Sequence, residues 1–115
     1  MENRVSIKDI EALEVYLRLL REPITYDMQR DLFSLMHWLD LTSDGFALRL
    51  QREYPQLTLQ ELNFCCLQRM GYSWEKIGEL MKVKDGTVRR YIYRVCSRLV
   101  IPGNKKDLEL FIASY

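Results

Sequence analysis

The residues Ser73-Trp-Glu-Lys-Ile-Gly-Glu-Leu-Met-Lys-Val-Lys-Asp-Gly-Thr-Val-Arg-Arg-Tyr-Ile-Tyr-Arg-Val-Cys-Ser-Arg-Leu99 decide the fold that this sequence predicts. Ser73 is a favourable N-cap, because its hydroxyl can accept a hydrogen bond from a free backbone N–H. Apolar residues then recur at helical spacing, first at Trp74, Ile77, Leu80 and Met81 and again at Val88, Ile92, Val95 and Leu99. The stretch therefore predicts two helices, one starting after Ser73 and one running from Asp85 to Leu99, joined by a short turn.

Two residues predict that these helices cross closely. Gly78 lies where the second helix is expected to cross the first, and a side chain there would hold the two apart. Its small size therefore outweighs the roughly 1 kcal/mol that glycine costs in a helix interior. Val83 is the only apolar residue of the turn, and we expect it to fill the gap between the helices.

The outer face of the second helix carries four arginines and, from Gly86 onward, no acid. The face consists of Arg89, Arg90, Tyr93, Arg94, Ser97 and Arg98. Like charges one turn apart, as at Arg90 and Arg94, repel each other, so an anionic partner explains the face better than solvent does. Arginine matches phosphate oxygens and guanine edges, and a helix fits the major groove of DNA. The pattern thus predicts a helix-turn-helix with residues 85–99 as its recognition helix.

The same residues resemble the LuxR-type DNA-binding domain, a pattern that is also close to sigma-factor region four. The matching segments are Leu57-Thr-Leu-Gln-Glu61, Gly71-Tyr-Ser73, Lys76-Ile-Gly-Glu-Leu80, Val83, Thr87-Val-Arg89, Tyr91 and Arg98-Leu99. The resemblance covers about half of the chain, from near Phe46 to the C-terminus. The flanking segments Phe46 to Thr58 and Asp107-Leu-Glu-Leu-Phe111 are similar to the version found at the C-terminal end of certain bacterial regulators. It implies a four-helix domain that binds DNA.

Two positions depart from the family pattern. Lys84 stands where the family usually has a Ser or Thr N-cap, so Asp85 is an alternative cap. Gly86 softens the first turn of the second helix. Both leave the exact start of the recognition helix open.

The resemblance assigns base reading to Arg89, Arg90 and Tyr93. A bidentate contact of arginine to guanine discriminates against other bases by roughly 1–3 kcal/mol. Contacts to phosphate, which set affinity and salt dependence rather than sequence preference, are expected from a second group. This group comprises Ser73, Trp74, Lys84, Thr87, Tyr91, Arg94, Arg98 and Lys105.

Each of these assignments has a structural alternative. The arginines could form an ordinary solvated face. Ser73 and Trp74 could act as a cap and a core anchor instead of offering backbone N–H groups to a phosphate. Tyr91 occupies a position that in the family is half packed and half in contact with the DNA backbone.

Residues 1–41 predict two further helices. Ser6-Ile-Lys-Asp9 resembles a capping box. The first helix has apolar residues at alternating spacings of three and four, at Ile10, Leu13, Leu17 and Leu20, and ends near Arg21 because Pro23 follows. The second helix, from about Thr25, carries Met28, Leu32, Leu35 and Leu39 on one face, with Phe33, Met36 and Trp38 widening its apolar surface. Two interpretations stay open: a hairpin packed on the C-terminal domain, or a coiled-coil-like surface through which two copies dimerise.

The rest of the chain completes an all-α fold in which residues 42–115 form the helix-turn-helix domain. A loop at 41–45 precedes a short helix with Phe46, Leu50 and Tyr54 that stops before Pro55. Thr58 and Glu61 form a capping box. They start a supporting helix that is expected to bury Leu59, Leu62, Cys66 and Met70 and to end at Gly71. A last short helix is expected from Asp107 to Ala113.

Composition places the chain among globular proteins. Its 115 residues are 48% hydrophobic and 29% charged, which suits one domain with an extension and makes disorder unexpected. Residues 69–115 contain ten Lys or Arg against five acids, whereas residues 1–68 contain seven against eleven, so the C-terminal half is the anion-binding candidate. No apolar run approaches the roughly 18 residues that span a bilayer, and the first residues are not a signal peptide. A cytoplasmic location is therefore expected.

The sequence offers no pattern for catalysis, a metal or a cofactor. His37 is the only histidine, which excludes a catalytic triad and a multi-histidine metal site. Cys65, Cys66 and Cys96 lack C-x-x-C spacing and are expected to be buried, reduced thiols. We find no phosphate-binding glycine loop, no nucleophile elbow and no paired carboxylates in an apolar setting, so an enzyme is not expected.

The sequence thus predicts a sequence-specific transcriptional regulator that binds double-stranded DNA as a dimer and receives its signal from another segment or a sensor partner. An adaptor that contacts RNA polymerase or a regulator through the basic face is one alternative, which the acidic, apolar-rich N-terminal half motivates. A sigma-like factor is another, although only the region-four pattern is present.

Overall fold

The computed structural model describes residues 4–115, and over this range the chain forms helices and no strand. The helices are α1 (Ile7–Arg21), α2 (Met28–Thr42), α3 (Phe46–Glu53), α4 (Leu59–Arg69), α5 (Trp74–Met81), α6 (Asp85–Leu99) and α7 (Lys105–Ser114), with a short 3-10 turn, η1 (Pro23–Thr25), between α1 and α2. The all-α prediction is confirmed.

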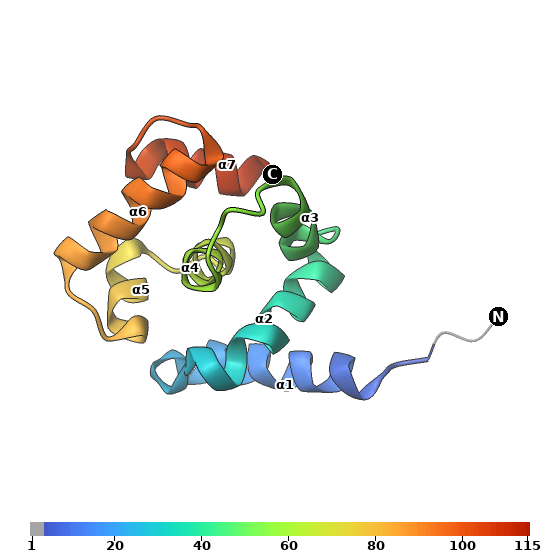
Figure 1. The fold of residues 1–115 in the computed structure, drawn as a ribbon. Coiled ribbons are helices and arrows are strands. Elements are labelled where there is room, and N and C mark those ends of the chain that lie inside the picture. The colour runs from blue at the N-terminus through green and yellow to red at the C-terminus, as the bar shows by residue number, and fades with distance from the viewer. Residues whose placement is uncertain (1–3) are drawn as a thin grey trace.

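Helix α4 lies at the centre, and the other helices surround it (Figure 1). Every residue from Glu61 to Leu67 is buried, whereas a surface helix buries only one face. One predicted core residue of this helix is misplaced: Leu59 is 44% exposed. It occupies the first position of α4, before the helix enters the ring of its neighbours.

The two predicted capping boxes are present. At the start of α4, the Thr58 hydroxyl accepts a hydrogen bond from the Glu61 N–H at 3.1 Å, and the Glu61 carboxylate accepts one from the Thr58 N–H at 2.9 Å. At the start of α1, Ser6 and Asp9 make the same reciprocal pair at 3.1 and 3.0 Å. These side chains satisfy donors that a helix N-terminus otherwise leaves free.

Two helices begin elsewhere than the sequence predicted. Helix α2 begins at Met28 and not near Thr25, because the Asp27 carboxylate caps it by accepting the Gln29 N–H at 3.0 Å. Helix α7 begins two residues before Asp107, because Asn104 Oδ1 accepts the Asp107 N–H at 2.8 Å and so serves as the N-cap.

Helices α1 and α2 pack side by side as a hairpin (Figure 1). The face of α1 that packs inward contains Ala12 and Leu19, both buried, and Tyr16, whose ring stacks on Trp38 of α2 with centroids 4.4 Å apart. The stripe that the sequence singled out lies outside this contact. Its members are 42% to 59% exposed: Ile10, Leu13, Leu17 and Leu20.

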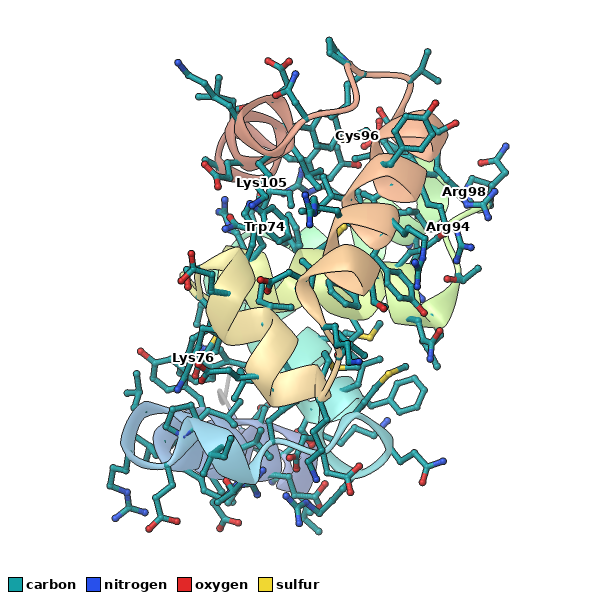
Figure 2. All side chains as sticks on the ribbon, turned by 90° about the vertical axis from the view of Figure 1, so that its left-hand side faces the viewer. Trp74, Lys76, Arg94, Cys96, Arg98 and Lys105 are labelled. Atoms are coloured by element: carbon teal, nitrogen blue, oxygen red, sulfur yellow. The ribbon has the colours of Figure 1, made fainter. Side chains whose placement is uncertain are left out.

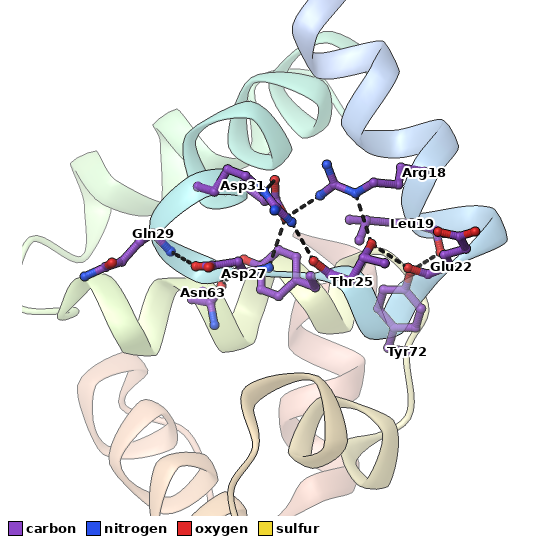
Figure 3. A network of polar contacts seen from close by, with 11 residues as sticks. Arg18, Leu19, Glu22, Thr25, Asp27, Gln29, Asp31, Asn63 and Tyr72 are labelled. Atoms are coloured by element: carbon purple, nitrogen blue, oxygen red, sulfur yellow. Dashed lines mark hydrogen bonds and ion pairs between the residues drawn. The ribbon is translucent and has the colours of Figure 1, made fainter.

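Two tyrosines join this hairpin to the rest of the chain. The Tyr26 hydroxyl, which is buried, donates to Asn63 Oδ1 on α4, and Asn63 Nδ2 donates to the Met81 sulfur on α5 at 2.9 Å. The Tyr72 hydroxyl donates to the Leu19 carbonyl at 3.0 Å (Figure 3). Buried side chains form one continuous cluster from Leu19 to Ile112. The domain boundary at residues 41 and 42 stays a prediction.

A buried carboxylate ties the end of α1 to the start of α2 (Figure 3). Asp31 is buried and accepts hydrogen bonds from the guanidinium groups of Arg18 and Arg30 and from the Asp27 N–H. Burial raises the pKa of the Asp31 carboxyl, but the hydrogen bonds from both arginines and from the backbone outweigh it, so the pKa lies below its usual value.

Candidate nucleic-acid interface

Helices α5 and α6 are joined by three residues, Lys82 to Lys84, and cross in close contact. Lys82 adopts the left-handed conformation with φ of 57°, and the Val83 N–H donates to the Gly78 carbonyl at 3.0 Å. A Cβ on Gly78 would lie 3.1 Å from a Val88 methyl and 3.3 Å from the Val83 carbonyl oxygen. The prediction that a side chain at Gly78 would hold the helices apart is therefore confirmed.

The start of α6 has no side-chain cap. Lys84 takes the N-cap position without a side-chain hydrogen bond, and Asp85 is the first helical residue. The alternative in which Asp85 acts as the cap is therefore wrong. The Asp85 carboxylate still lies in the first turn, where negative charge interacts favourably with the helix dipole.

The inner face of α6 packs as predicted. Val88, Ile92, Val95 and Leu99 are buried, and Cys96 is buried beside them. The contact fixes which side of α6 faces away from the core. The outward side carries Arg89, Arg90, Tyr93 and Arg94, all exposed, and it runs along the surface of the molecule (Figure 2).

The three predicted base-reading residues make different contacts with the rest of the protein. Arg90 Nη2 donates to the Thr87 hydroxyl one turn earlier at 3.0 Å. The Tyr93 ring is 68% exposed, and one of its edges lies against Gly103, where a Cβ would come within 3.1 Å of it. The Arg89 side chain borders a shallow polar hollow between α5, α6 and α7. The structure thus places the three residues on adjoining parts of one outward surface.

The hollow has a volume of about 250 Å³ and mixed charge. Its walls are Trp74, Glu75, Asp85, Val88, Arg89 and Lys105. The two basic side chains therefore face two carboxylates across it, although none of the four forms an ion pair with another. The net potential of this flank is accordingly lower than its arginine and lysine alone suggest.

Arg98, a predicted phosphate contact, is held by a buried acid. Its Nε donates to Glu61 Oε1 at 2.7 Å, and the Glu61 side chain is only 2% exposed. Burial raises the pKa of the Glu61 carboxyl, but the Thr58 N–H and the Arg98 guanidinium outweigh it, so the pKa lies below its usual value. One carboxylate therefore caps α4 and fastens the C-terminal end of α6 to it.

Tyr91 and Arg94 form a stacked column on the same side of α6. The Tyr91 ring stacks on Phe64 of α4 with centroids 4.5 Å apart, and its hydroxyl donates to Gln60. The Arg94 guanidinium lies 5.8 Å from the centre of the Tyr91 ring, a cation–π distance. Tyr91 is thus packed, while Arg94 remains exposed above it.

The start of α5 is occupied by structural contacts. The Ser73 hydroxyl accepts the Lys76 N–H at 3.1 Å and so caps the helix. Trp74 is buried, and its Nε1–H donates to Glu109 of α7 at 2.7 Å. The side chains of both residues therefore have the cap and anchor roles that were the alternatives to phosphate binding. Lys84 and Lys105 are exposed (Figure 2 labels Lys105), and Thr87 is half-buried.

The sequence did not identify the partners on α4 and α7. Glu61 was recognised as a capping residue, but its contact with Arg98 joins positions 37 residues apart. Gln60 and Glu109 carry no pattern of their own, because a single polar residue on a helix is usually solvated. A helical wheel of α6 shows which side chains share a face, whereas these contacts depend on how the helices pack.

The thiols of Cys65, Cys66 and Cys96 are all buried and free, and burial raises the pKa of Cys65 to about 12. Across residues 4–115 no cluster of His, Cys, Asp or Glu side chains could hold a metal ion. Within the same range, no helix combines the length and the apolar character that crossing a membrane requires.

Comparisons with protein-family models, with curated proteins and with solved structures found no match to this chain.

Proposed function

We propose that this chain binds double-stranded DNA with α6 in the major groove and regulates transcription. The observation that carries the proposal is the outward surface of α6, where Arg89, Arg90 and Arg94 are exposed and form no ion pair with any residue that the structure describes. From Gly86 to Leu99 the helix has no acid that could neutralise them. A surface of this kind is suited to phosphate oxygens and to the edges of guanine bases.

The dimensions and support of α6 suit this role. At 1.5 Å per residue its 15 residues span about 22 Å, and the major groove admits one helix. The inner face is buried, Tyr91 stacks on Phe64, and Arg98 is fixed to Glu61. These contacts hold α6 rigidly on α4, so DNA would meet a helix whose orientation is already set.

In this proposal the position of each α6 residue decides whether it contacts bases or phosphates. Arg89, Arg90 and Tyr93 read base edges, while Arg94 contacts phosphate. Lys84 directly precedes the first turn of α6, and Lys105 lies on the wall of the hollow that Arg89 borders; both add phosphate contacts. Arg98 is the exception among the basic residues, because Glu61 already neutralises it.

Fluorescence anisotropy with a mixed-sequence duplex, repeated between about 50 and 200 mM salt, tests the proposal. Release of counterions predicts that log affinity falls linearly with log salt, with a slope near −0.9 per phosphate contacted. The double variant R89A/R90A is expected to bind more weakly and to lose sequence preference on a site selected from random DNA. The control K8A/R52A removes the same charge from exposed positions on α1 and α3 and should bind as the parent does.

Absence of binding at the lowest salt, with the protein folded, would overturn the proposal and favour the protein-contact alternative. If K8A/R52A weakened DNA binding as much as R89A/R90A does, the DNA would be attracted by the net charge of the protein and not by a defined surface on α6. Only a loss confined to the α6 variant supports α6 as the DNA-contacting helix.

A further inference from the structure

Exposed apolar side chains concentrate on α1 and its flanks. Seven of the fourteen large apolar residues that are exposed in the described chain lie between residues 5 and 24. They are Val5, Ile7, Ile10, Leu13, Leu17, Leu20 and Ile24. Contiguous apolar surface of this kind marks an interaction site, whereas scattered exposed leucines do not.

The spacing along α1 defines the shape of the partner. Leu13, Leu17 and Leu20 follow one another at intervals of four and three along α1, and Ile24 is exposed in the 3-10 turn η1 after the helix has ended. We call these four residues the α1 seam. Such intervals are the core positions of a coiled coil, so the surface that fits them is another helix with the same spacing. The inward face of α1 is already packed on α2, so the seam needs a partner from outside the hairpin.

We propose that the α1 seam of a second copy covers this surface, with the two helices antiparallel. A two-fold axis requires a surface that complements itself, so that residue i meets residue j and residue j meets residue i. In the register that places Leu17 on Leu20 of the second copy, Leu20 meets Leu17 in return, and Leu13 meets Ile24. All four residues of the seam are then covered in both copies.

Charge beside the seam favours this arrangement. Glu14 and Arg21 flank the same edge of the seam and both are exposed, and neither forms an ion pair with another residue between 4 and 115. In the antiparallel register each Glu14 lies beside Arg21 of the second copy, which gives two opposite-charge pairs. A parallel pairing would instead bring Glu14 towards Asp9 of the second copy, two like charges.

A contact one helix wide belongs to the small, reversible class of interfaces, so a concentration-dependent dimer is expected. The proposal does not rest on DNA binding. It concerns a different helix and is measured without DNA, so either proposal can fail while the other stands.

Sedimentation equilibrium of the whole chain from about 1 µM to about 1 mM tests the dimer. The parent is expected to dimerise within this range. Leu20→Glu should leave a monomer, while Leu110→Glu, which places the same charge on an equally exposed leucine of α7, should dimerise as the parent does. Circular dichroism of each variant confirms that its helices are intact.

A charge exchange tests the register. Glu14→Arg and Arg21→Glu should each weaken dimerisation by about threefold to tenfold. The double variant E14R/R21E restores opposite charges across the axis and should dimerise close to the parent. A monomeric parent at the highest concentration, a Leu20→Glu variant that still dimerises, or a double variant weaker than either single one would overturn the proposal.

Discussion

Helices α1 and α6 have the same length and similar sequence patterns, but the structure uses them in opposite ways. Each has 15 residues and a stripe of apolar side chains at intervals of three and four. In α6 the stripe is buried and the polar face is outside. In α1 the stripe is exposed, and a second, less regular face that includes Ala12 and Leu19 is buried. Periodicity therefore identifies a face without showing that this face is the buried one.

The difference follows from the residues that lie on the face of each helix opposite its apolar stripe. The back of α6 carries four arginines, which cannot be buried without partners, so only one orientation is available. The back of α1 offers Ala12, Tyr16 and Leu19, which can pack on α2. Alanine lets the two helices approach closely, and Tyr16 stacks on Trp38. A helix with two apolar faces can pack through either, and here the hairpin uses one and leaves the other exposed.

The largest expected difference in stability is between substitutions of two adjacent leucines on α1. Leu19 is buried and Leu20 is 59% exposed. Leu19→Ala should lower the free energy of unfolding by about 2–5 kcal/mol, because it leaves a cavity in the core. Leu20→Ala should change it by less than about 0.5 kcal/mol, the range of ordinary surface substitutions. Urea denaturation at low protein concentration, where any dimer has dissociated, measures both.

If Leu19→Ala and Leu20→Ala lowered the free energy of unfolding equally, Leu19 would not be the buried residue and Leu20 the exposed one. Leu110→Ala on α7 is the matched control for an exposed leucine on another helix, and it should behave as Leu20→Ala does.

The next largest effect on stability is expected from neutralising the two buried carboxylates. Asp31 lies beside α1, and Glu61 lies beside α6. Asp31→Asn should destabilise the fold by about 1–3 kcal/mol at pH 7, because two arginines lose a charged acceptor. Glu61→Gln should have the same sign and a smaller size, since it loses only Arg98, whose side chain is partly exposed.

The dependence on pH follows from the direction of the pKa shifts. Both carboxyls have a pKa below its usual value in the folded chain. Their stabilisation is therefore complete above about pH 5, where the unfolded carboxyls are also largely ionised, and is lost as the pH falls through the folded values. The gap in urea midpoint between the parent and Asp31→Asn should narrow from pH 7 to below 4. A gap that is constant or grows would mean that the Asp31 charge does not stabilise the fold.

A smaller effect is expected at two glycines around α6. Gly78→Ala should lower the free energy of unfolding by about 1 kcal/mol, because overpacking against Val88 exceeds the gain in helix propensity. Gly86→Ala should raise it by about 0.4–1 kcal/mol, since nothing lies within 4 Å of the added methyl group. The melting temperature should therefore fall in the Gly78→Ala variant and rise in the Gly86→Ala variant. Stabilisation by Gly78→Ala would show that the crossing of α5 and α6 is looser than described.

What the sequence predicted correctly depends on residues close together along the chain. The capping boxes of α1 and α4, the buried stripe of α6 and the close crossing at Gly78 are all local patterns, with partners three to ten residues apart. Local competition also explains the misplaced start of α2: Asp27 is a better cap than its neighbours, and Pro23 favours a 3-10 turn.

What it could not predict depends on helices that meet only in the fold. The orientation of α1 is set by its packing on α2, whereas the exposure of Leu59 and the contact of Arg98 with Glu61 are set by packing around α4. The candidate site shows the same division. The outward direction of Arg89, Arg90 and Tyr93 followed from the wheel of α6, whereas the packing of Trp74 and Tyr91 required the positions of Glu109 and Phe64.

The smallest effect concerns two arginines one turn apart on α6, and it rests on the proposed DNA binding. Arg94→Ala should reduce the salt slope of DNA affinity by about one, the loss of a single phosphate contact. Arg98→Ala should leave the slope nearly unchanged but lower the melting temperature, because its guanidinium serves Glu61. An equal fall of the slope in both variants would mean that Arg98 leaves Glu61 for a phosphate on binding. On DNA the outer surface of α6 would then include the flank that the free protein uses to fasten α6 to α4.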